Sequence, residues 1–194
     1  MNNYTNRNML EFQDVVRRHF NFLESQYGYK CIFSDMYIVK YCSDKAYLNV
    51  YHERISYEIY FEIGLLPEDY NNQLKINLSD VTEISGILNK NTLYQASNKN
   101  DVNMVVEKLA DLIRMHAGGA LNASLKDFEK IACCRAQKQH NILRLQEFKE
   151  AEEKAARAWI VKDYKTVADA YNIFHELLDP VQLKKLEYAR RMLI

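Results

Sequence analysis

The stretch AYLNVYHERISYEIYFEIGLL, residues 46–66, carries the clearest structural signal in the chain. It predicts two strands, Tyr47–Tyr51 and Ile55–Leu66, joined as a hairpin. In the second strand apolar side chains alternate with polar or tyrosyl ones, which is the period of a strand with one buried face. The apolar set is Ile55, Tyr57, Ile59, Phe61 and Ile63, and the other set is Ser56, Glu58, Tyr60 and Glu62.

The register of this hairpin follows from the need to bury Leu48 and Val50 on the same face as the apolar set. A three-residue loop would place these two side chains on the wrong face, because a slip of one residue inverts a strand. A loop of two or four residues at His52 to Ile55 satisfies the requirement. It predicts that Tyr51 pairs with Ser56, Asn49 with Glu58 and Tyr47 with Tyr60.

Further elements lie on both sides of the hairpin. Residues 9 to 28 predict a helix with a buried face that includes Met9, ended by Gly28, and strands follow at Tyr29–Phe33 and Met36–Cys42. Pro67 ends the sheet. Short helices are expected from Val81 to Leu88, capped by Ser79 and Asp80, and from Asp101, which can cap its helix, to the glycines at 118 and 119. The predicted fold class is α+β: an N-terminal helix and short helices on one face of a three- to four-stranded antiparallel sheet, followed by an all-helical C-terminal region.

The C-terminal third contains no strand pattern and is rich in good helix formers. We expect a long helix, partly unsupported in its middle, followed by a helical hairpin. Residues 1–120 carry 12 basic and 15 acidic side chains, whereas residues 121–194 carry 14 and 11. We therefore predict two regions, 1–119 and 120–194, with the boundary at Gly118-Gly119.

The composition is that of an ordinary globular chain. Its 194 residues hold 26 basic and 26 acidic side chains, so a general attraction to nucleic acid is not expected. No run of about 18 apolar residues occurs and no apolar leader is visible, which predicts a cytoplasmic protein without membrane contact. The four cysteines are expected to be free thiols in a reducing compartment.

The sequence offers little support for turnover chemistry. Its five glycines cannot form a nucleotide-binding loop, its five histidines are scattered, and no Cys-x-x-Cys occurs, so we expect no cofactor, no metal site and no catalytic residue. One alternative is a thiol-dependent enzyme that uses Cys133 or Cys134, because the neighbouring Arg135 could activate a thiolate. The more ordinary interpretation is that one of the two cysteines faces the core.

The polar face of the hairpin is the best candidate for a binding surface. Tyrosine offers a large, stiff contact area with a polar tip, and aromatic residues are enriched in interface hot spots. Two carboxylates beside them favour a basic partner. The candidate partner-binding residues are Tyr47, Asn49, Tyr51, Glu58, Tyr60 and Glu62. The competing interpretations are that the basic C-terminal helices cover this face, or that the tyrosines are simply good strand residues.

Residues 155–193 read AARAWIVKDYKTVADAYNIFHELLDPVQLKKLEYARRML and resemble the second half of a single degenerate tetratricopeptide repeat. No second copy is found, although about three repeats are needed to form a solenoid. The resemblance implies a helical hairpin. An adaptor or homodimer using it would bind through Tyr164, Tyr171, Phe174 and Tyr188.

The overall order of a helix, a strand meander over residues 41–63 and a helical tail rich in Lys and Glu is similar to small bacterial proteins associated with polymorphic toxin systems. This resemblance is one of general pattern without a diagnostic motif. It implies an immunity-type protein: a non-catalytic inhibitor that binds and blocks a cognate toxin domain, and the acidic, tyrosine-bearing face suits a basic toxin domain.

Overall fold

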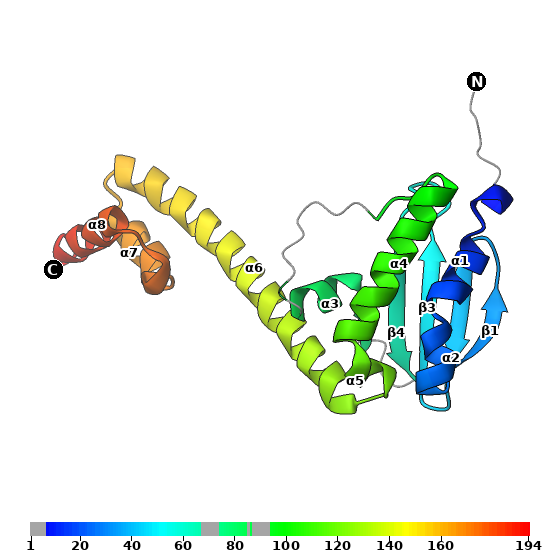
Figure 1. Ribbon diagram of the computed structural model, residues 1–194. Helices are drawn as coiled ribbons and strands as arrows, with labels where there is room; N and C mark the ends of the chain where they lie inside the picture. The colour runs from blue at the N-terminus through cyan, green and yellow to red at the C-terminus, as the bar shows by residue number, and fades with distance from the viewer. Residues whose placement is uncertain (1–6, 67–73, 85, 87–93) are drawn as a thin grey trace, which may run out of the picture. The chain divides into compact units, whose positions relative to one another are not determined.

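The computed structural model describes residues 7–66, 74–84, 86 and 94–194 of the chain (Figure 1). The chain forms two compact units, Met1–Cys133, here called the sheet unit, and Cys134–Ile194, here called the helical unit. The division lies 14 residues beyond the predicted edge at Gly119. The reason is that the residues just after the glycines still pack in the sheet unit, where Leu121, Phe128 and Ile131 are buried in its core.

The sheet unit begins with helices, as predicted, but in three pieces: η1 (Arg7–Leu10), α1 (Phe12–His19) and α2 (Asn21–Tyr27). The helical backbone is interrupted at Phe20 (φ −97°, ψ 9°). Gly28 has φ 71° and ends α2 in the left-handed conformation that glycine adopts without strain. Met9 lies ahead of α1 and is exposed, so its predicted place in the buried face was wrong.

The sheet has five antiparallel strands in sequential order, one more than the largest number predicted. They are β1 (Lys30–Ser34), β2 (Ile38–Cys42), β3 (Ala46–His52), β4 (Ile59–Leu65) and β5 (Lys75–Asn77). The strand that the sequence did not predict is β5, which pairs with β4 through Ile76 opposite Ile63. Three residues are too few to show an alternating pattern.

The register of the central hairpin differs from the predicted one by four residues. Tyr51 pairs with Tyr60, Asn49 with Glu62 and Tyr47 with Gly64. The connection is longer than expected because the turn occupies residues 54–56 and β4 begins only at Ile59. A shift by an even number preserves the alternation of faces, so Leu48 and Val50 are fully buried as predicted.

Three further helices of the sheet unit are α3 (Leu78–Ile84), α4 (Lys99–His116) and α5 (Gly118–Leu121). The predicted Ser79/Asp80 cap lies one turn earlier, because Asn77 and Asp80 each bind the other's backbone N–H with a side-chain oxygen. Asn98 caps α4 in the place expected of Asp101. The predicted helical positions Ile87 and Leu88 lie outside the described residues.

The described helices of the sheet unit gather on one side of the sheet (Figure 1). Helices α1, α3 and α5 each contact α4, and α2 contacts α1. The core between these helices and the sheet contains large, fully buried side chains from both layers, among them Phe12, Phe20, Leu48, Phe61 and Leu109. Each such side chain stabilises the fold by about 1.5–3 kcal/mol relative to exposure.

The helical unit holds most of α6 (Leu125–Ile160) together with α7 (Tyr164–Asn172), η2 (His175–Leu177) and α8 (Pro180–Arg191). The expected hairpin is present. Asp163 caps α7, and Asp179 begins α8 with Gln182 in a reciprocal capping box that has Pro180 in the first turn. The middle of α6, from residue 136 to 141, is exposed on every side, as expected of a helix partly unsupported there. Ile142 and Leu145, where the apolar pattern predicts renewed burial, are also exposed, so that part of the prediction was wrong.

Candidate functional site

The face of the sheet opposite the helices is here called the outer face. Side chains that pair across antiparallel strands lie on the same face, so the register defines its members. Cross-strand pairing places thirteen residues there, in three rows: Ile38, Tyr51, Tyr60; Phe33, Lys40, Asn49, Glu62, Asn77; and Lys30, Cys42, Tyr47, Gly64, Lys75. Five of the six predicted partner-binding residues are therefore brought together. The sixth, Glu58, is exposed two residues before Tyr60.

The first row centres on two stacked tyrosines. The rings of Tyr51 and Tyr60 have centroids 4.9 Å apart and an interplanar angle of 19°. The hydroxyl of Tyr60 donates to Glu53 Oε1 at 2.8 Å, and Asn49 Nδ2 donates to the Tyr51 hydroxyl at 3.2 Å. Both rings are half-buried. The stack is thus held in place before any partner arrives, which reduces the entropy lost on binding.

The third row offers a partner little exposed aromatic surface. Tyr47 is only 7% exposed, because its ring lies flat over Gly64, where an added Cβ would be 2.4 Å from the ring. Its hydroxyl donates to Glu62 Oε1 at 3.1 Å, and Lys75 Nζ donates to the same oxygen at 3.2 Å. Glu62 and Tyr47 therefore bind each other, and little of the Tyr47 ring is left for a partner.

The phenols of this face remain protonated. Burial raises the pKa of Tyr47 to about 12, helped by the adjacent negative charge of Glu62. Burial also raises the pKa of Tyr60, and the hydrogen bond to Glu53 adds to the effect. Near neutral pH both hydroxyls therefore serve as hydrogen-bond donors. This is chemistry of recognition, since neither phenol is activated as a nucleophile.

The charge of the outer face is more mixed than the sequence suggested. Lys40 lies beside Asn49 and approaches the Phe33 ring at 5.9 Å, and Lys75 pairs with Glu62. The carboxylates collect instead at the turn between β3 and β4, where Glu53 and Glu58 are exposed. Any preference for a basic partner therefore belongs to Glu53 and Glu58 at that end of the face, where Arg54 and Arg7 supply two positive charges of their own.

An open apolar hollow of about 530 Å³ lies at the same end. Ile55 is 93% exposed on its rim, although the sequence placed it in the core of a strand. Such exposure of a large aliphatic side chain beside aromatic rings is typical of a contact site. The main residues around the hollow are Tyr37, Ile38, Tyr51, Glu53, Arg54 and Ile55. Of these only Tyr51 was predicted, and the polar run Glu53-Arg54 was the available sign of a turn.

Arg7 fixes this turn from 46 residues away in the sequence. One guanidinium nitrogen, Nη2, donates to the carbonyl oxygens of Glu53 and Arg54, each at 2.6 Å. The same guanidinium lies 4.1 Å from the Tyr57 ring centroid, and Arg54 lies 4.4 Å from that of Tyr37. The hollow is therefore preformed by contacts distant in sequence.

Buried His52 lies under this turn. Its Nε2 is 3.0 Å from the carbonyl oxygen of Ala96, and its Nδ1 has no hydrogen-bond partner among the described residues. Burial lowers the pKa of His52 to about 4, and the positive charge of Arg7 acts in the same direction. The imidazole is neutral near pH 7, and its ring packs against Phe12.

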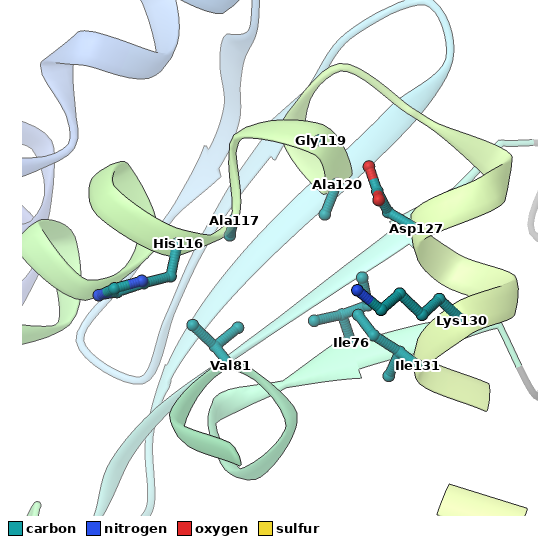
Figure 2. A pocket seen from close by; sticks show the side chains of 9 residues that line it. All are labelled: Ile76, Val81, His116, Ala117, Gly119, Ala120, Asp127, Lys130 and Ile131. Carbon is teal, nitrogen blue, oxygen red and sulfur yellow. The ribbon is translucent and has the colours of Figure 1, made fainter. Parts of the chain in front are cut away.

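A second hollow, of about 130 Å³, lies between α3, α5 and the start of α6 (Figure 2). Its apolar wall comprises Ile76, Val81, Ala117, Ala120 and Ile131. The carboxylate of Asp127 lies so close to Gly119 that an added Cβ would be 1.9 Å from Oδ2, so a larger residue there would require the Asp127 side chain to move. The volume corresponds to only about four waters of the bulk liquid, too small for a nucleotide or flavin.

The alternative binding residues of the helical unit divide into two pairs. Tyr171 and Phe174 are buried, with Tyr171 in the core of that unit, whereas Tyr164 is half-buried and Tyr188 exposed. Only the second pair can contact a partner without unfolding the hairpin.

All four cysteines are free, and Cys133 and Cys134 are exposed on α6. Neither lines the two hollows described above. Within the described residues, no group of three His, Cys, Asp or Glu side chains could hold a metal ion. A search of the described helices finds none of the length and apolar character needed to cross a bilayer.

Comparison with family models, with curated proteins and with solved structures finds no match for this chain. The function is therefore argued from the geometry of the site.

Proposed function

We propose that this protein is a non-catalytic binding module that docks a partner protein on the outer face of its sheet. The observation that carries the proposal is the stacked pair Tyr51 and Tyr60 beside an apolar hollow with Ile55 on its rim, on the face opposite the described helices of the sheet unit. Rigid aromatic anchors next to a pocket are the usual centre of an interface hot spot.

The partner best suited to this face presents an apolar side chain for the hollow and basic groups around it. Glu53 and Glu58 lie at the turn where the hollow opens, and charges at the rim of an interface speed association. A bacterial immunity-type inhibitor of a basic toxin domain would need a binding face of this kind. The resemblance in general sequence pattern supports that assignment. On this proposal the protein acts in the cytoplasm without a cofactor.

The test is to measure binding to the product of the adjacent gene by calorimetry. The variant Ile55→Glu/Tyr60→Ala should weaken binding at least about a hundredfold, because it removes two central contacts. Ile173→Glu, a change at an exposed isoleucine of the helical unit, is the matched control and should bind normally. Circular dichroism of each variant verifies that the fold is unchanged.

If the adjacent gene product does not bind, affinity capture from the native host with the wild type and both variants identifies the partner. A partner retained equally by all three proteins would refute the assignment of the outer face. A partner that binds through this face but is not a toxin would refute only the immunity role.

A further inference from the structure

The connection between α6 and α7 exposes two adjacent aliphatic side chains. Ile160 is 80% exposed and Val161 is 73% exposed. The next residue, Lys162, is also exposed and adopts a left-handed backbone with φ 62°. Connections between helices are ordinarily polar, so a protruding Ile-Val pair indicates a contact that the isolated chain does not supply.

Three aromatic rings form the base of this protrusion. The ring of Trp159, the only Trp in the chain, is 5.9 Å from that of Tyr164 and 5.6 Å from that of Tyr188, and the two tyrosines are 5.6 Å apart. The contacts join the connection to the last turn of α8. There Met192 donates its backbone N–H to Tyr188 and is half-exposed. The exposed pair Ile160 and Val161, which directly follows Trp159 in the chain, and this aromatic cluster are together called the Ile-Val tip.

The surroundings of the Ile-Val tip are basic. Residues 160–165 and 184–191 contain six Lys and Arg side chains and two acidic ones. One of the acids, Asp163, is already engaged by the backbone and hydroxyl of Thr166 at the start of α7. Lys185 Nζ lies 5.6 Å from the Trp159 ring centroid. The rest of the helical unit holds six basic and seven acidic side chains, so its positive charge is concentrated in these two segments, although the guanidinium of Arg190 donates to Asn172 Oδ1 at the other end of α7.

We propose that the Ile-Val tip binds the surface of an anionic lipid bilayer. Trp and Tyr favour the interface between headgroups and acyl chains, aliphatic side chains enter the boundary below it, and each lysine or arginine near the surface contributes about 1 kcal/mol. A protruding tip needs no matching pocket in a bilayer. A second copy of the chain is a poor occupant, because the two basic rims would repel each other.

This mode of attachment requires no membrane-spanning helix. The proposal departs from the sequence-based expectation of no membrane contact, which rested on the absence of a spanning segment, because a peripheral tip needs no such segment. The inference is also independent of the outer face of the sheet unit, since the two surfaces share no residue.

Sedimentation of the full chain with vesicles tests the proposal. We expect binding to vesicles that are roughly one third phosphatidylglycerol, none to pure phosphatidylcholine, and a loss of binding as salt rises from about 50 to about 300 mM. Insertion should shift Trp159 emission to shorter wavelength. Ile160→Glu/Val161→Glu should weaken binding at least about tenfold, whereas Ile173→Glu, at the other end of α7, should not.

Two double charge-reversal variants test whether the basic side chains around the Ile-Val tip contribute to vesicle binding. Lys162→Glu/Lys185→Glu should abolish binding, and Lys149→Glu/Lys154→Glu, with the same change of charge farther down α6, should retain most of it. Thermal melts establish that every variant is folded. The proposal is overturned if the wild type stays in the supernatant with anionic vesicles, as it would if the tip bound an acidic protein. It is also overturned if the Ile160/Val161 variant binds like the wild type.

Discussion

The two units of this protein are stabilised in different ways. The sheet unit buries large side chains between two layers, including four phenylalanines that are at most 1% exposed: Phe12, Phe20, Phe61 and Phe128. Five of the nine core residues of the helical unit are alanines: Ala155, Ala158, Ala168, Ala170 and Ala189. Alanine lets helices approach closely but buries little apolar area, so the helical unit has far less hydrophobic stabilisation.

The two proposed binding surfaces, the outer face and the Ile-Val tip, also differ in how closely they are connected to the core of their unit. In the sheet unit the core is complete without the outer face, so polar and tyrosyl side chains are free to serve recognition there. In the helical unit the aromatic cluster of Trp159, Tyr164 and Tyr188 both packs between the helices and forms part of the exposed surface. Changes in its surface should therefore affect its stability more readily.

The largest expected effect is in the core of the sheet unit. Phe61→Ala removes a fully buried ring and should cost about 3–5 kcal/mol of unfolding free energy. Native-state hydrogen exchange should show this loss of stability in β3 and β4. Trp159 fluorescence reports on the helical unit alone, so the midpoint of its urea-unfolding transition should be unchanged. Loss of both signals together would show that the two units unfold as one.

The converse change tests the helical unit. Leu186→Ala, at a site 1% exposed in α8, should cost about 3 kcal/mol there and shift Trp159 emission toward that of the unfolded chain. The amides of β3 and β4 should remain protected. Val181→Ala, an exposed site on the same helix, is the control and should change stability by less than about 0.5 kcal/mol. Equal effects from the two substitutions would contradict the described packing.

A smaller, pH-dependent effect is expected from His52. The unfolded chain binds a proton at this residue near pH 6.5, but the folded protein resists it until about pH 4. The stability of the sheet unit should therefore be constant above pH 6.5 and fall by about 2 kcal/mol as the pH is lowered to 4. His52→Gln keeps a donor for the Ala96 carbonyl and cannot titrate, so urea unfolding of β3 and β4 should lose this component. If the pH profile of that variant is unchanged, the pH dependence of stability arises from other groups.

Much of the sheet could be predicted because alternation is a local property. The faces of β3 and β4 follow from their own sequences, and the error of four residues in register leaves Leu48, Val50, Ile59, Phe61 and Ile63 buried as predicted, although Ile55 is exposed in the turn. The position of the turn could not be predicted in this way. Residues 55–63 continue the same alternation, and tertiary contacts such as those of Arg7 with the carbonyls of Glu53 and Arg54 help to hold the turn at residues 54–56.

The candidate site shows the same division. The sequence indicated the tyrosines and their common face, but it did not reveal that Tyr47 lies flat on Gly64, or that Tyr51 stacks on Tyr60. The hollow at Ile55 combines residues from β2, β3 and the turn after β3, so no single segment carries its pattern.

By itself the sequence determined the α+β class, the order of the main elements and the sidedness of the central strands, because these depend on periods of two and 3.6 residues within one segment. Only the tertiary structure decided the fifth strand, the end of the sheet unit within α6 and the hollow beside the stacked tyrosines. Each of these arises where residues far apart in the chain pack together, and local periodicity holds no record of such contacts.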